Sequence, residues 1–184
     1  EQPRFDIAAE LDGIGFAASE RRPGVRGFSG LLRANRLGGR LEMRSRDVSI
    51  ALPEYIPQPI DIDYADGTVI WRSTDHHTTV LSDSIRVGNT VFDSQVNVQL
   101  TLDGDGGAPA IDLASEWSVT DIAALTGYIP QKIVKPKLYN WFQSALLAGS
   151  IPNGKTVLAG PLDKFPFDND EGQFLLEASV RNLT

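Results

Sequence analysis

The segment Phe92-Asp-Ser-Gln-Val-Asn-Val-Gln-Leu-Thr-Leu102 is the longest run of alternating apolar and polar residues in this chain. Apolar side chains occupy nearly every second position in it, and polar side chains occupy the positions between them. An extended chain turns successive side chains to opposite faces, so this period of two predicts a strand with one apolar and one polar face.

The same alternation recurs along most of the chain. Turn-forming pairs such as Asp12-Gly13, Gly38-Gly39, Asp66-Gly67, Gly88-Asn89 and Asn153-Gly154 separate the alternating runs at short intervals. This spacing is typical of antiparallel meanders, and it predicts a mainly β fold with a curled antiparallel sheet. The further alternating runs are 5–11, 40–44, 48–52, 60–64, 81–87, 111–117 and 174–180.

One amphipathic α-helix is predicted at 136–148. Pro136 suits the first helical position and Gly149 suits the residue after the end. Apolar residues follow at helical spacing between them, which predicts one apolar side on this helix. They are Leu138, Trp141, Phe142, Ala145 and Leu146.

The predicted helix is too small for the predicted sheet. A helix of this length is ~20 Å long and ~10 Å across, so it covers about two strands at a spacing of ~4.8 Å. About ten strand candidates carry an apolar face, and large apolar surfaces are rarely left in water. The sheet therefore either closes on itself as a sandwich or barrel, or curls into a groove that an apolar ligand fills.

Composition excludes several classes of function. The net charge is −7 over 184 residues and the basic residues are spread along the sequence, which argues against nucleic acid and against an anionic membrane surface. The chain has no cysteine, so disulfides and thiolate chemistry are excluded. The longest uncharged run is too short to span a bilayer. We interpret 1–184 as a single β-rich segment of a longer protein.

No catalytic or metal-binding pattern stands out. His76 and His77 follow a turn between two strand runs, without the spacing of metal ligands or of a catalytic triad. Asp61 and Asp63 fit the solvated side of a strand, and 103–107 lacks the distal glutamate of a calcium loop. We expect no catalytic residue, no metal and no bound cofactor.

The three tryptophans favour packing over a sugar-binding platform. Trp141 lies on the apolar side of the predicted helix, whereas Trp71 and Trp117 lie in strand runs.

Several distinctive stretches lie between residues 50 and 180. They include Pro59-Ile-Asp-Ile62, Tyr128-Ile-Pro130, the helix with Trp141 and Phe142, and Phe165-Pro-Phe167. In these stretches the chain resembles the AsmA-like family of Gram-negative bacteria, and its YhdP type in particular. The family is related to TamB and to bridge-like lipid transfer proteins. The resemblance implies an open groove of β-sheet that holds phospholipid acyl chains and carries lipid between the inner and outer membranes, without a chemical step.

The resemblance also implies a place and partners. The parent protein would lie in the periplasm, anchored in the inner membrane by a segment outside this chain, and support the outer-membrane permeability barrier. The partners would be phospholipid acyl chains and other segments of the parent chain, and the cut strand edges could self-associate. The helix would pack on the sheet or gate the groove through Leu138, Trp141, Phe142 and Leu146. The predicted groove residues are Ile50, Leu52, Ile62, Leu81, Ile85, Phe92, Val96, Val98, Leu100, Ile111, Leu113, Phe174 and Leu176.

Two other classes of protein stay open on the sequence alone. A closed β-sandwich would serve as a binding or adhesion module for carbohydrate or protein, and exposed Trp71 or Trp117 would favour it. A hydrolase would need the loop of His76 and His77 or the aspartate pairs, and loss of activity on replacing either histidine would reveal it.

Overall fold

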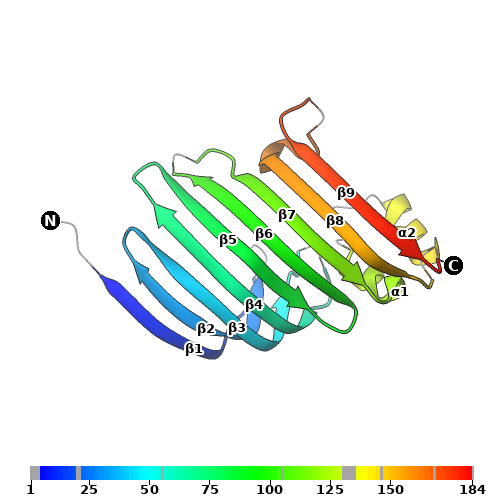
Figure 1. The fold of residues 1–184 in the computed structure, drawn as a ribbon, viewed down its shortest axis with the longest axis horizontal. Helices are drawn as coiled ribbons and strands as arrows, with labels where there is room; N and C mark the ends of the chain where they lie inside the picture. Colours follow the sequence, from blue (N-terminus) through cyan, green and yellow to red (C-terminus); the bar gives the residue numbers. More distant parts are fainter. Residues whose placement is uncertain are drawn as a thin grey trace.

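A computed structural model describes residues 5–19, 22–54, 56–104, 106–129, 136–145, 147–167 and 169–183. Its strands form one nine-stranded antiparallel sheet in which each strand pairs with its neighbours in sequence (Figure 1). The strands are β1 (Asp6–Phe16), β2 (Gly24–Asn35), β3 (Gly38–Ala51), β4 (Ile60–Ser73), β5 (His77–Gly88), β6 (Phe92–Asp103), β7 (Ala110–Val119), β8 (Ser150–Pro161) and β9 (Gln173–Arg181).

The sheet is open. Strands β1 and β9 are its two edges, lie at opposite sides of the sheet and do not pair with each other (Figure 1). The predicted mainly β fold with a single antiparallel sheet is therefore confirmed. The closed β-sandwich is wrong for the described part of the chain, because all of its named strands belong to this one sheet.

The helices interrupt the meander between β7 and β8. They are α1 (Ile122–Leu125), the 3-10 helix η1 (Thr126–Tyr128) and α2 (Pro136–Ala145), and a further 3-10 turn, η2 (Leu162–Lys164), follows β8. The predicted helix at Pro136 is confirmed, and its described span ends at Ala145. The backbone N–H of Ile122 donates to the carbonyl of Gly149 at 3.0 Å, which ties the start of this insertion to the start of β8.

Bulges interrupt the regular pairing of several strands. Gly13 in β1, Gly27 in β2, Asp47 in β3 and Ser84 in β5 have positive φ angles of 57°, 79°, 55° and 55°. Register shifts accompany them in the ladders that join these strands. Because a bulge bends its strand and increases the local twist, these positions explain the curved course of the strands in Figure 1.

Serine hydroxyls satisfy the backbone next to these bulges. The N–H of Gly13 donates to Ser29 Oγ at 2.9 Å, and the N–H of Ser29 donates to Ser45 Oγ at 2.9 Å. Ser45 Oγ in turn donates to the carbonyl of Ser29 at 2.8 Å, and Ser45 is 0% exposed. The buried hydroxyl of Ser45 therefore replaces two ladder hydrogen bonds that the bulge prevents.

A Ser45→Ala variant is expected to lose about 1–2 kcal/mol of unfolding free energy, because it leaves the N–H and the carbonyl of Ser29 without this partner. Urea unfolding measures the change. Ser115→Ala is the matched control, since Ser115 is a half-buried strand serine whose hydroxyl has no hydrogen-bond partner among the described residues. Equal stability of the Ser45→Ala variant and the parent would contradict the role given to this hydroxyl.

Some of the predicted turns are wrong. Asp66-Gly67 lies inside β4 and Asn153-Gly154 inside β8, and Asp12-Gly13 is a bulge inside β1 rather than a turn. The glycines are needed for close approach: a Cβ at Gly67 would come 2.9 Å from Ile85 Cα, and one at Gly154 would come 2.4 Å from the Trp117 ring. Glycine in a strand can therefore reflect packing across strands rather than a chain reversal.

Candidate functional site

A single row of side chains crosses all nine strands on one face of the sheet. Directly opposed residues of antiparallel strands share a face, so the register identifies the row. We call it the central row, and Ser82 is its polar member among apolar residues. Its members, from β1 to β9, are Ala9, Leu32, Leu41, Val69, Ser82, Val98, Leu113, Leu158 and Phe174.

Parallel rows extend the same face on both sides of the central row. One runs from β1 to β7 through Ile7, Ala34, Gly39, Trp71, Val80, Leu100 and Ile111. Another runs from β5 to β9 through Ile85, Val96, Ser115, Thr156 and Leu176. We call the side of the sheet that carries these rows the apolar face.

The opposite side of the sheet, the polar face, carries the alternating charged and amide side chains. Arg46 pairs with Asp66 at 2.8 Å across β3 and β4, and Arg40 pairs with Glu42 at 3.0 Å along β3. The Tyr64 hydroxyl donates to the Asp93 carboxylate, and this hydrogen bond raises the pKa of Tyr64. The two faces thus differ in chemistry over the whole width of the sheet.

Most of the apolar face lacks a second protein layer in the described residues. Nine strands span about 38 Å at their usual spacing, whereas ten helical residues span about 15 Å. The described hydrophobic side chains that are fully buried are few, and none belongs to the central row. Phe174 and Leu176 at the β9 edge are 47% and 57% exposed. The mismatch between helix and sheet that the sequence predicts is therefore present in the structure.

The register brings most of the predicted groove residues together on the apolar face. Val98 and Leu113 stand side by side at the centre of the central row, and Phe174 ends it. The predicted residues that lie on this face are Ile85, Phe92, Val96, Val98, Leu100, Ile111, Leu113, Phe174 and Leu176.

The remaining predicted groove residues are placed differently. Leu81 pairs with Gln99 on the polar face, because the bulge at Ser84 shifts the alternation of β5 between Ser82 and Ile85. Ile62 is only 5% exposed and pairs with Val48, which is 3% exposed. Val48 and Ile50 lie near the end of β3, beyond the positive-φ Asp47, and Ile62 lies near the start of β4. Leu52 follows the end of β3.

Several residues of the apolar face were missed by alternation alone, among them Val69, Val80 and Leu158. Trp71 and Trp117 also belong to this face, and each lies over a glycine directly opposite it. An added Cβ at Gly39 would come 2.2 Å from the Trp71 ring. Trp117 Nε1 donates to Thr156 Oγ1 at 3.0 Å. Both tryptophans are half-buried, as the packing interpretation predicts.

The other candidate residues do not form a reactive cluster. His77 begins β5, with its Nδ1 3.2 Å from Thr74 Oγ1, and His76 is exposed in the preceding turn. The part of the chain that the structure describes contains no group of three or more His, Cys, Asp or Glu that could hold a metal ion. Asp61 and Asp63 are both exposed.

The predicted gating contacts lie outside the described residues. The side chains of Leu138, Trp141 and Phe142 and the whole of Leu146 are among the parts left undescribed, so the predicted role of α2 at the sheet stays a prediction. Among the described helices, none is long and apolar enough to cross a membrane.

The arginines are spread along the sequence but gather in space. Arg33, Arg40, Arg44, Arg46 and Arg72 all lie on the polar face of β2, β3 and β4. Arginines that are far apart in the sequence therefore lie on adjacent strands on this side of the sheet.

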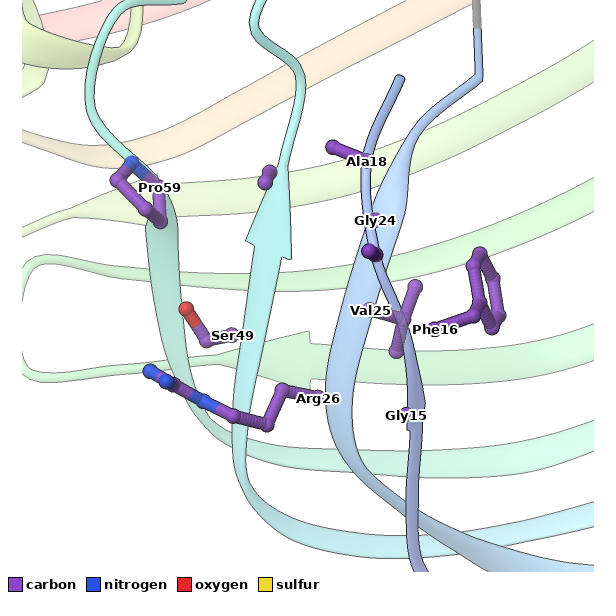
Figure 2. Close-up of a pocket in the computed structure, with 10 residues that line it drawn as sticks. Gly15, Phe16, Ala18, Gly24, Val25, Arg26, Ser49 and Pro59 are labelled. Atoms are coloured by element: carbon purple, nitrogen blue, oxygen red, sulfur yellow. The ribbon is translucent and has the colours of Figure 1, made fainter.

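Two hollows lie at opposite ends of the first four strands. One, of about 410 Å³, is formed by the end of β1, the start of β2 and the end of β3, with Pro59 on its far side; Figure 2 shows Phe16, Val25, Arg26 and Ser49 around it. The other, of about 750 Å³, lies at the β2–β3 turn. Its lining includes Ile7, Ala34, Gly39 and Trp71 of the apolar face.

A single open β-sheet with one apolar and one polar face defines a class of protein that presents an extended apolar surface instead of enclosing a core. Comparison with known proteins gives the family. The family model described as "YhdP protein" matches residues 1–184, and the chain belongs to this AsmA-like family.

One relative is the protein named intermembrane phospholipid transporter YhdP of Escherichia coli (strain K12). It is 21% identical over 160 residues, which are 87% of this chain but 13% of that protein. The chain thus spans a small part of the relative it matches. No solved structure matches this chain.

Proposed function

We propose that this chain is a segment of a larger, AsmA/YhdP-like periplasmic protein whose apolar face forms a groove for phospholipid acyl chains. The groove carries lipid between the inner and outer membranes and so supports the outer-membrane permeability barrier. The parent protein is anchored in the inner membrane by a segment outside this chain. The observation that carries the proposal is the central row, which continues without a charged side chain across nine strands.

Acyl chains supply the second layer that the described protein does not. Each methylene that leaves water for an apolar surface contributes about 0.8 kcal/mol. The central row offers such contact on every strand, and only Ser82 in it carries a side-chain hydroxyl. Contact of this kind is not directional, so a bound chain can move along the row without breaking specific hydrogen bonds. The transport requires no catalytic residue and no cofactor.

The comparison with known proteins also supports this proposal. The Escherichia coli relative is named as an intermembrane phospholipid transporter. Its name describes a transporter rather than an enzyme, and it describes lipid as the cargo. In this proposal the neighbouring segments of the parent chain continue the sheet at β1 and β9, whose outer edges are free of pairing within the described strands.

Native mass spectrometry of the purified chain, combined with lipid extraction, tests the proposal. We expect phospholipid to co-purify with the chain, and a delipidated sample to take up phospholipid again from added vesicles. The same spectra report dimers formed through the free edges. A lipid-free monomer that takes up no lipid would contradict the proposed groove.

A further inference from the structure

Ser82 is the polar member of the central row, and its hydroxyl is unsatisfied. It lies on β5 between Val69 of β4 and Val98 of β6, so its side chain points to the apolar face. The residue is 9% exposed, and no group in the described part of the chain makes a hydrogen bond with its Oγ. Neither the described protein nor bulk water therefore satisfies this hydroxyl.

Comparable hydroxyls in the sheet have partners. Ser45 Oγ, which is also buried, donates to the carbonyl of Ser29 at 2.8 Å. Thr156 Oγ1, on the apolar face of β8, accepts from Trp117 Nε1 at 3.0 Å. A buried hydroxyl without a partner lowers stability, and an apolar residue would fill this place as it does in the rest of the row. Such an exception is expected where a ligand binds.

The surroundings of Ser82 select a neutral hydrogen-bond acceptor. Both of its cross-strand neighbours are valines, and the central row contains no charged side chain. A charged group at this point would therefore lose its water without gaining a counter-ion. An uncharged oxygen that arrives with the acyl chains avoids this cost. The ester carbonyl that joins an acyl chain to glycerol is such an oxygen, since it accepts a hydrogen bond and carries no charge.

We propose that the Ser82 hydroxyl donates a hydrogen bond to an ester carbonyl oxygen of a phospholipid on the apolar face. This inference rests on the proposed function and adds one directional contact to it. Rotation about the Cα–Cβ bond moves Oγ among three staggered positions and turns it toward a carbonyl that lies on the face. Because β5 is the fifth of nine strands, the glycerol end of the lipid has a preferred resting position at the middle of the row.

A competition between two lipids that differ in the carbonyls tests the inference. Vesicles contain equal amounts of dioleoyl phosphatidylcholine, a diester, and di-O-oleyl phosphatidylcholine, the diether that lacks both carbonyls. The whole 184-residue chain is incubated with them, and mass spectrometry of the extracted lipid gives the ratio of bound diester to bound diether. A general loss of affinity leaves this ratio unchanged, so the ratio reports the carbonyl contact itself.

Ser82→Ala removes the hydroxyl. The control is Ser118→Ala, because Ser118 is half-buried and pairs with Asp93 on the polar face. We expect the diester-to-diether ratio to fall about fivefold in Ser82→Ala and to stay within about twofold of the parent in Ser118→Ala. Ser82→Ala should also resist urea at least as well as the parent, since it removes an unsatisfied hydroxyl. A clear loss of stability would mean that the hydroxyl has a partner inside the protein, and would overturn the inference.

The other outcomes separate the two proposals. If the parent takes up both lipids and Ser82→Ala has the same ratio, the carbonyl contact is wrong, a trapped water is the remaining partner of the hydroxyl, and the groove stands. An equal fall of the ratio in Ser82→Ala and Ser118→Ala would also overturn the contact, because the effect would not depend on the position of the hydroxyl. If the parent takes up neither lipid, both proposals fail.

Discussion

A Val98→Asp variant is expected to lose most of its bound phospholipid while keeping its fold. Val98 stands in the middle of the central row, between Ser82 and Leu113, and is half-buried rather than enclosed. A carboxylate there must lose its water when an acyl chain covers it, which costs far more than one lost methyl contact. We expect at least a tenfold lower lipid-to-protein ratio, equivalent to about 1.4 kcal/mol or more. Lipid extraction from equal amounts of purified protein measures it.

The neighbouring residue provides the matched control. Asn97 lies on the polar face of the same strand, and its Oδ1 accepts the N–H of Ser84 at 2.6 Å. Asn97→Asp adds the same charge one position away and keeps an oxygen acceptor for that N–H. This variant should retain its lipid, and urea unfolding should show both variants folded. A Val98→Asp protein that unfolds, or two variants that lose lipid equally, would indicate that the face is not a lipid-binding surface.

The alternation of β6 predicts its place in the sheet because nothing interrupts the ladder with β7. Phe92 to Thr101 pair with Val119 to Ala110 without a register shift, so every second residue of both strands stays on one face. Phe174 and Leu176 lie on the apolar face for a related reason, since the ladder of β8 and β9 is regular from Asn153 to Ala159. In such strands the period of two identifies the apolar face from the sequence.

The prediction fails for Leu81 because β5 contains one extra residue. Ser84 adopts a positive φ of 55°, and its N–H donates a hydrogen bond to Asn97 Oδ1 on the next strand, which supports this bulge. Serine gives no local indication of such a bulge, and Asn97 is thirteen residues away in the sequence. A pattern that counts positions along one strand therefore assigns Leu81 and Ile85 to the same face of the sheet, although the bulge between them puts these two side chains on opposite faces.

Features that depend on pairing between strands were also invisible in the sequence. The glycines of β3 and β8 that lie under Trp71 and Trp117 resemble turn residues when they are considered alone. Arg33, Arg40 and Arg72 are spread over forty positions and meet because β2, β3 and β4 are adjacent. The existence of α2, in contrast, follows from local spacing in the sequence.

A Gly154→Ala variant is expected to unfold about 2 kcal/mol more easily than the parent, because the added methyl overpacks the face at Trp117. The new Cβ would come 2.4 to 2.6 Å from three atoms of the indole ring. The ring has to move, and the hydrogen bond of 3.0 Å from Trp117 Nε1 to Thr156 Oγ1 is lost with it. The free energy of urea unfolding measures the effect.

A double-mutant cycle separates this clash from the general effect of alanine in a strand. In a Trp117→Leu background the indole is gone, so Gly154→Ala should become neutral or stabilising. Gly127→Ala is the control for adding a methyl group, because a Cβ at Gly127 meets nothing within 4 Å. If Gly154→Ala costs the same with and without the indole, Trp117 does not lie over Gly154 in solution. An indole that lies flat over Gly154 forms part of the surface on which an acyl chain would lie. An indole that stands away from the sheet would instead obstruct an acyl chain at this end of the apolar face.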